Sequence, residues 1–155
     1  TKMKKLNILS LHRMGDPRFR RKAVVDLEYF MLHHFPDHNH IVHDASLVPP
    51  WYLKNINWDA ILLGSTFLCK VLHSDELISA YHDYEWIKES KALKFAFPQD
   101  DYDNSELLDQ WMCDWLVDVV YTVLYDHAEI LYPKYKKIKH KISRYRWYFF
   151  ICSSG

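Results

Sequence analysis

The chain has few glycines and few cysteines, and both shortages argue against common kinds of site. Glycine occurs only three times in 155 residues, so the GxGxxG loop that binds NAD or FAD in the usual mode is absent. The phosphate-binding pattern GxxxxGK(S/T) is absent as well. The three cysteines are widely spaced and form no CxxC pair, which argues against a disulfide framework or a cysteine-rich zinc site.

Long hydrophobic runs are also missing. No segment approaches the roughly 20 apolar residues that span a bilayer. Residues 1–5 lead into a strand-like segment without the apolar stretch of a secretory signal. Since unpaired cysteines are typical of a reducing compartment, we expect a cytoplasmic protein with no membrane span.

Hydrophobic residues make up 49% of the chain, enough for the packed core of one domain. Five short apolar segments are typical of buried strands, and the segments between them have apolar residues at helical spacing. This alternation predicts an α/β fold, a single doubly wound Rossmann-like domain with a mainly parallel five-stranded sheet. The strands are expected at residues 6–11, 41–43, 59–64, 93–97 and 118–123, and the helices at 17–34, 75–90, 104–113 and 126–132.

Acidic residues are missing from the end of the chain. The sequence holds 20 acidic and 20 basic residues, but positions 134–155 carry seven basic residues and no acidic one. We therefore divide the chain into a Rossmann-like domain over residues 1–133 and a basic, aromatic C-terminal tail over residues 134–155. The tail mixes lysine and arginine with aromatic residues, as nucleic-acid or anionic-lipid contacts do. The zero net charge argues against a dedicated nucleic-acid binder, and a solvated or partner-docked terminus is favoured.

The apolar end of this tail, residues 147–151, has the sequence WYFFI. Such a run is expected to pack on an exposed sheet edge or on a second copy of the chain. The sequence therefore predicts self-association through the tail as one way to form a homo-oligomer.

Polar residues follow the expected strands. Ligands of open parallel sheets bind outside the carboxyl ends of the strands, so these residues are candidates for a site. The helix start expected at Asp16-Pro17 favours an anion near the first of these loops. The candidates are His12, Arg13, Gly15, Asp16, Ser65, Thr66, Gln99, Asp100 and Asp101.

The run of residues 98–103, PQDDYD, has three carboxylates within four residues. They could hold a divalent cation, supply a general base or cap the helix that follows. Capping is favoured for at least one of them, because hard cations need convergent oxygens that one short loop seldom supplies. Five histidines lie between residues 33 and 43, but they match no zinc-ligand pattern. We expect neither a metal nor another cofactor.

Four motifs occur in order: ILSLHRMGDPRFRR, DAILLGSTFLC, FAFPQDDYD, and WLVDVVYTVLYDH followed by LYP. Together they resemble the N-terminal domain of bacterial glycosyltransferases of the two-domain B-type fold, over about residues 6–133. The resemblance implies two Rossmann-like domains that face a cleft. It implies that the first shapes the acceptor side, that the second binds most of the nucleotide-sugar, and that a bound metal is generally not needed.

The resemblance also implies roles for the candidate residues. A base that takes the proton of the acceptor hydroxyl is expected among Asp100, Asp101 and His12. Substrate contacts are expected from the remaining candidates, which are Arg13, Gly15, Asp16, Ser65, Thr66 and Gln99.

The leading hypothesis is a glycosyltransferase-like, acceptor-side domain linked to transfer of a sugar from a nucleotide-sugar to a glycan. Such a domain is incomplete alone and needs a second α/β domain, covalently attached or in trans. The alternative is a non-enzymatic module that binds a nucleotide or a sugar, since fold alone does not separate the two. A metal-assisted phosphotransfer or hydrolysis site at PQDDYD is the third hypothesis.

Overall fold

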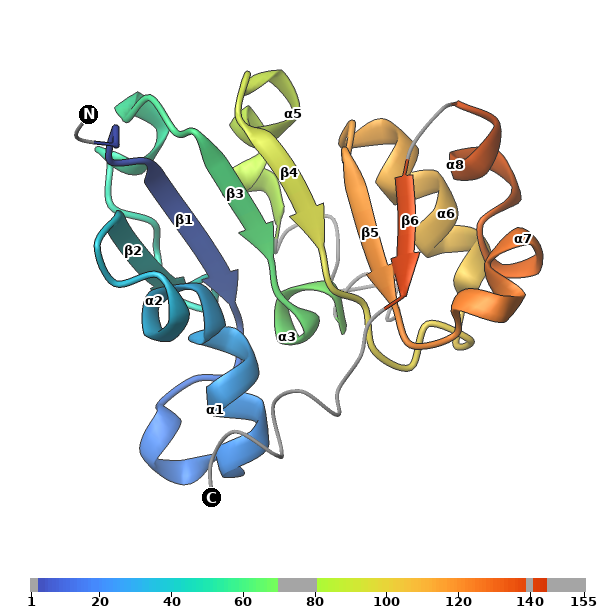
Figure 1. Ribbon diagram of the computed structural model, residues 1–155, viewed down its shortest axis with the longest axis horizontal. Coiled ribbons are helices and arrows are strands. Elements are labelled where there is room, and N and C mark those ends of the chain that lie inside the picture. The colour runs from blue at the N-terminus through green and yellow to red at the C-terminus, as the bar shows by residue number, and fades with distance from the viewer. Residues whose placement is uncertain (1–2, 70–80, 139–140, 145–155) are drawn as a thin grey trace.

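A parallel sheet of six strands organises the protein (Figure 1). The computed structural model describes residues 3–69, 81–138 and 141–144. The strand order is β2-β1-β3-β4-β5-β6, and every neighbouring pair is parallel. The doubly wound α/β prediction is confirmed, with six strands instead of five. The strands are β1 (Asn7–His12), β2 (Asn39–Asp44), β3 (Ala60–Leu63), β4 (Leu93–Ala96), β5 (Val119–Thr122) and β6 (Lys141–Arg144).

Helices lie on both faces of the sheet. Figure 1 shows α1 and α2 on the face turned toward the viewer, here called the front face, and α6 and α8 on the back face. None of the helices in the described residues is long and apolar enough to cross a membrane. The helices are η1 (Pro17–Phe19), α1 (Lys22–Glu28), α2 (Phe30–His34), η2 (Leu53–Asn55), α3 (Ser65–Leu68), η4 (His82–Tyr84), α5 (Trp86–Glu89), α6 (Ser105–Asp114), η5 (Tyr125–His127), α7 (Ala128–Leu131) and α8 (Pro133–Lys137).

Two of the expected helices differ from the structure. The helix expected over residues 17–34 is divided into η1, α1 and α2, with Tyr29 leaving helical geometry between the last two. Part of the helix expected over residues 75–90 lies outside the described residues, and the remainder forms η4 and α5.

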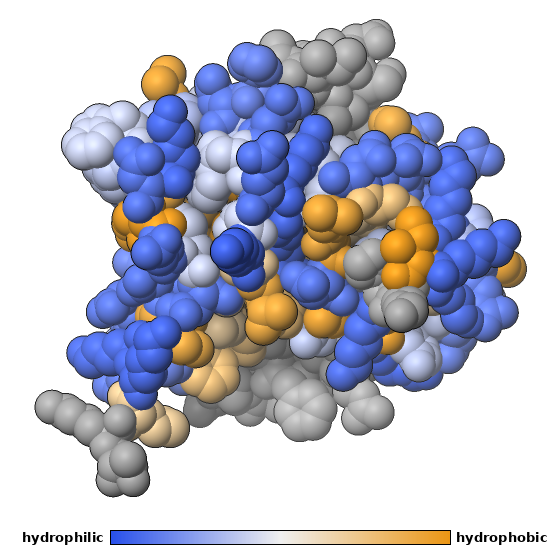
Figure 2. Space-filling view, turned by 90° about the horizontal axis from the view of Figure 1, so that it is seen from above, coloured by the Kyte–Doolittle hydropathy of each residue, from blue (hydrophilic) through white to orange (hydrophobic). Residues whose placement is uncertain are grey.

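The two faces of the sheet have cores of different size. Alternate residues of a strand point to opposite faces, and the back-facing Leu9, Ile61 and Val120 belong to the main core with α5–α8. On the front face, the buried core within the described residues comprises Ile8, Ala60 and Leu62, with partly buried side chains around them. Seen from the amino-terminal end of the strands, the surface is mostly hydrophilic, with hydrophobic groups between the charged ones (Figure 2). Most of the hydrophobic burial therefore lies behind the sheet.

The first part of the tail expected over residues 134–155 belongs to a helix and a strand of the domain. Tyr135 of α8 is fully buried, its hydroxyl donates to the carbonyl of Val117 at 2.9 Å, and its N–H donates to Asp109 Oδ1 at 2.8 Å. β6 then pairs with β5 as the sixth strand. The basic residues of α8 are exposed while Tyr135 is buried. Because most residues of this helix are charged, the sequence did not indicate that one of its side chains is buried. The rest of the expected tail, residues 145–155, lies outside the described residues.

Candidate functional site

The strand order places a topological switch point between β1 and β3. The chain turns toward β2 after β1 and toward β4 after β3, so the two loops diverge at the carboxyl ends of the strands. The backbone N–H of Arg13, after β1, donates to Thr66 Oγ1, after β3, at 2.8 Å. The structure thus brings the candidate loops after β1 and β3 into direct contact.

Glu28, the last residue of α1, connects this helix to the junction through hydrogen bonds. Its side chain is buried, and Oε1 accepts hydrogen bonds from Ser65 Oγ at 2.9 Å, Thr66 N at 2.9 Å and Thr66 Oγ1 at 3.0 Å. Sequence analysis missed Glu28. The available signal was its place four residues after Val24, on the apolar side of an expected helix.

The hydroxyls of Ser65 and Thr66 therefore already have an acceptor within the chain, the Glu28 carboxylate. Ser65 is buried, and both hydroxyls donate to Glu28. Gly64 makes this close approach possible, because a Cβ there would lie 1.9 Å from Glu28 Oε2. The substrate contacts expected of the two hydroxyls stay a prediction, while their observed role is to join α1 to β3.

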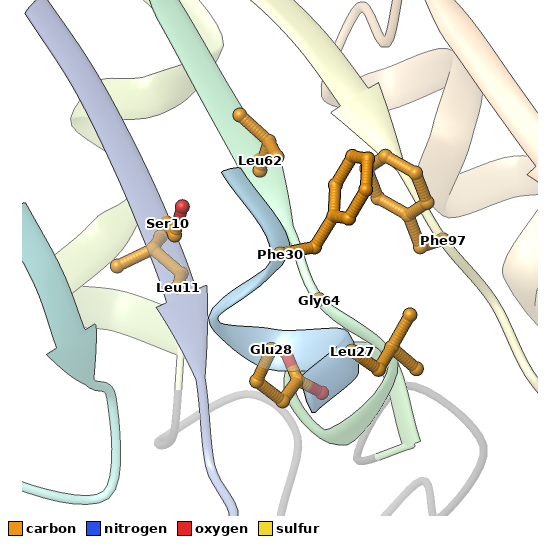
Figure 3. Close-up of a pocket in the computed structure, with 8 residues that line it drawn as sticks. All are labelled: Ser10, Leu11, Leu27, Glu28, Phe30, Leu62, Gly64 and Phe97. Carbon is orange, nitrogen blue, oxygen red and sulfur yellow. The ribbon is translucent and has the colours of Figure 1, made fainter. Parts of the chain in front are cut away.

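A small pocket lies on the front face beside Glu28 (Figure 3). Its volume of about 30 Å³ suits water rather than a sugar. The residues that line the pocket are mainly apolar, and Glu28 is the ionisable residue among them. Its lining residues are Ser10, Leu11, Leu27, Glu28, Phe30, Leu62, Gly64 and Phe97.

His12 lies at the end of β1 with only 3% of its surface exposed. Burial lowers the pKa of its imidazole, and the nearby Asp44 carboxylate opposes this effect. Its Nδ1 accepts the N–H of Met14 at 3.3 Å, which assigns the proton of the neutral ring to Nε2. In this state His12 is a hydrogen-bond donor at Nε2. The role of base expected for it requires the other tautomer.

Arg13 is half-buried at the switch point. Its Nη1 donates to the carbonyl of Ala45 at 3.2 Å. Its Nε is buried and makes no hydrogen bond within the described part of the chain. The guanidinium is therefore anchored at one nitrogen and has an unmatched donor at another.

Gly15 and Asp16 shape the loop between Arg13 and η1. Gly15 has φ +75°, the left-handed region that glycine adopts without strain. Asp16 caps η1 by accepting the backbone N–H of Arg18 at 2.9 Å, and it pairs with the Arg18 guanidinium at 2.6 Å. The helix start predicted at Asp16-Pro17 is confirmed, with Pro17 in the first turn of η1.

The loop after β4 separates the two adjacent aspartates. Asp100 is exposed and has φ 52°, whereas Asp101 is fully buried. Asp101 Oδ2 accepts the Tyr132 hydroxyl at 2.7 Å and also the Thr122 hydroxyl, and Asp101 Oδ1 is buried and has no hydrogen-bond donor among the residues that the structure describes. Gln99 is half-buried before them. Of the two carboxylates, only that of Asp100 is available to a ligand in solution.

Metal-ligating side chains do not group in the described residues. Across residues 3–69, 81–138 and 141–144, no three histidine, cysteine, aspartate or glutamate side chains are placed to hold an ion. For PQDDYD, the opposite orientations of Asp100 and Asp101 explain why adjacent acids do not form such a group.

The buried Glu28 predicts a specific pH dependence of stability. Burial raises the pKa of this carboxyl, and the hydrogen bonds from Thr66 and Ser65 oppose the rise. Because the pKa is raised in the folded state, the protonated Glu28 carboxyl contributes to the free energy of unfolding. This contribution is fully present below the unfolded pKa, about 4.3. It is lost as the pH rises from there through the folded pKa. We expect Glu28→Gln, which does not ionise, to lose less unfolding free energy than the wild type over this range.

Urea unfolding at a series of pH values measures this difference. Glu106→Gln, at an exposed position of α6, is the matched control and should keep the wild-type pH profile. Identical profiles for the wild type and Glu28→Gln would contradict a perturbed carboxyl at position 28.

The junction between β1 and β3 is thus braced by hydrogen bonds and carries Arg13, while Asp100 presents an exposed carboxylate beyond β4. Its bracing comes from Glu28, Ser65 and Thr66. Compared with known proteins, the chain matches no family model, no curated protein and no solved structure.

Proposed function

We propose that this domain is the acceptor-side half of a glycosyltransferase, linked to transfer of a sugar from a nucleotide-sugar to a glycan. The order of the four sequence motifs supports the proposal. The parallel sheet supports it too, because its switch point brings the first and second motifs together. The observation that carries it is Arg13 at this junction, where parallel sheets form a ligand-binding crevice, with a buried Nε that has no acceptor among the described residues.

Arginine suits the ligands of such a transfer. Its planar guanidinium offers five N–H donors and matches phosphate oxygens or sugar hydroxyls. The hydrogen bond from Nη1 to Ala45 fixes its orientation. A ligand oxygen that enters the crevice would provide the acceptor that Nε lacks, and a buried unmatched donor costs about 1–3 kcal/mol.

The transfer also needs a base. The base takes the proton of the acceptor hydroxyl, the acceptor oxygen bonds to the anomeric carbon, and the bond from that carbon to the nucleotide phosphate breaks. The phosphate leaves with the electron pair, and Arg13 would stabilise its charge. Among Asp100, Asp101 and His12, we assign the base to Asp100 because its carboxylate is exposed.

The alternative function is a non-enzymatic module that binds a nucleotide or a glycan. The burial of His12 and Asp101 favours it, since both side chains are turned into the protein. Ligand binding without sugar transfer, also when a donor-binding α/β domain is supplied in trans, would establish this alternative.

Ligand binding tests the role of Arg13. Nucleotide-sugars, free nucleotides and oligosaccharides are added to the full chain, and a ligand of the folded state raises the melting temperature. We expect Arg13→Gln to weaken binding about 10- to 100-fold, as loss of a charged hydrogen bond does. Arg18→Gln is the matched control, because Arg18 is exposed and pairs with Asp16.

Two outcomes contradict the proposal. If no nucleotide-sugar or glycan raises the melting temperature, the crevice is not a binding site for this class of ligand. If a ligand binds equally well to the wild type and Arg13→Gln, Arg13 is not part of its site.

A further inference from the structure

The front side of β4 and β5 is an apolar surface. Here we call it the β4–β5 face. No member of this surface is fully buried, whereas Ala96 and Val120, which point to the back of the same strands, are both 0% exposed. The β4–β5 face consists of Leu93, Phe95, Phe97, Val119, Tyr121 and Val123.

Three aromatic rings form the middle of this face. The rings of Phe97 and Tyr121 stack with centroids 5.0 Å apart and an angle of 7° between their planes. Phe95 also stacks on Tyr121, at 6.5 Å. The parallel register, with Phe95 beside Val119, makes these side chains neighbours across the two strands.

No helix of the described residues covers the β4–β5 face. On the front side, α1 and α2 lie beside β1 and β2 (Figure 1), and Phe30 of α2 reaches Phe97 at the rim of the face, where both line the small pocket (Figure 3). Parallel sheets are normally covered on both faces. Leu93 and Val123 of this face are exposed and its other four residues are half-buried. An apolar face of this kind that no helix covers marks an interaction surface.

The chain supplies a segment of matching chemistry directly after β6. Residues 147–151 read WYFFI, five consecutive apolar or aromatic residues, and they lie outside the described residues. β6 ends at Arg144, which is in register with Thr122 of β5. Neighbouring strands are about 4.8 Å apart and a residue spans up to about 3.5 Å, so Trp147 is within reach of Tyr121.

The handedness of the fold favours the front face for this segment. Crossovers between parallel strands are right-handed. In this sheet, the connection from β1 to β2 uses the front face, while those from β3 to β4 to β5 to β6 run in the opposite direction along the back. A segment that returns from β6 toward β4 with the same hand lies on the front.

We propose that residues 147–151 pack on the β4–β5 face of the same chain and complete the front layer of the sheet. The segment buries the stacked rings of Phe97 and Tyr121. The occupant is thus a segment of this chain, and no second copy is needed.

Cross-linking of the full chain tests the proposal directly. Cys152 follows the segment, and Val123→Cys places a thiol for it to be linked to at the carboxyl end of β5, where Val123 is 39% exposed. We expect a short bis-maleimide to join residues 123 and 152 within one chain, as identified by peptide mass spectrometry. Glu89→Cys is the matched control, at an exposed position of α5 behind the sheet, and should form no such link.

A double-mutant cycle gives an independent measurement. Trp147→Ala should lower the melting temperature and raise the binding of the apolar dye ANS several-fold. Both effects should largely disappear in a Tyr121→Ala background, because contacting residues are not additive. Trp51→Ala, at an exposed tryptophan, should change neither.

Three results would overturn the proposal: additive effects of Trp147→Ala and Tyr121→Ala, equal links to positions 123 and 89, or links that join two chains. In the last case, light scattering would show a dimer through the tail. None of these measurements uses a sugar or nucleotide, so they are independent of the proposed function.

Discussion

Asp101→Ala is expected to destabilise the domain by about 2–4 kcal/mol, because it leaves two buried hydroxyls without an acceptor. The hydroxyls of Thr122 and Tyr132 both donate to Asp101 Oδ2, and all three residues are fully buried. Burial and the Asp101 carboxylate raise the pKa of Tyr132, so its hydroxyl stays protonated and donates. Urea unfolding of the purified variant measures the loss.

The matched control is Asp100→Asn. Asp100 is exposed and has a positive φ, which asparagine tolerates better than alanine, so we expect a change within about 0.5 kcal/mol. In a sugar-transfer assay with the donor-binding domain supplied in trans, we expect Asp100→Asn to lose transfer while its stability is kept. Equal stability of both variants would show that Asp101 does not join β4 to β5 and α7.

Gly64→Ala is expected to cost about 2–4 kcal/mol, although Gly64 has an ordinary φ of −68°. The reason is space. The added Cβ would lie 1.9 Å from Glu28 Oε2 and 2.7 Å from the carbonyl oxygen of Leu11. Displacing Glu28 would break its hydrogen bonds to Ser65 and Thr66, and moving the backbone of β1 would disturb the sheet. Thermal or urea unfolding measures the effect.

Combining Gly64→Ala with Glu28→Ala separates the two clashes. Removing the carboxylate relieves its contact with the new Cβ, but the Leu11 carbonyl remains too close. We therefore expect the double variant to be more stable than the sum of the two single effects, yet less stable than Glu28→Ala alone. Strict additivity would contradict the close packing of Gly64 on Glu28.

Much of the architecture could be predicted because its signals are local. The segments at residues 59–64 and 93–97 are short apolar runs, as buried parallel strands require. The polar residues after β1, β3 and β4 could be assigned to one end of the sheet, because parallel strands all end on the same side.

The sixth strand had no such signal. β6 reads KISR, and only Ile142 packs against the back core. An edge strand has one paired side, so its sequence need not be apolar throughout. Its basic residues made it resemble a solvated tail.

The sequence by itself determined the α/β alternation, the main strands and the loops in which polar residues collect, because apolar periodicity and chain direction are properties of neighbouring residues. The tertiary structure alone decided which polar groups are buried. Asp100 and Asp101 are adjacent and have the same side chain, but only Asp101 is buried. Its carboxylate accepts hydrogen bonds from Thr122 and Tyr132, which lie 21 and 31 residues away in the sequence. Glu28 acquires its role from Ser65 and Thr66, more than 35 residues later. Burial and hydrogen bonding depend on distant partners, and these meet only in the folded chain.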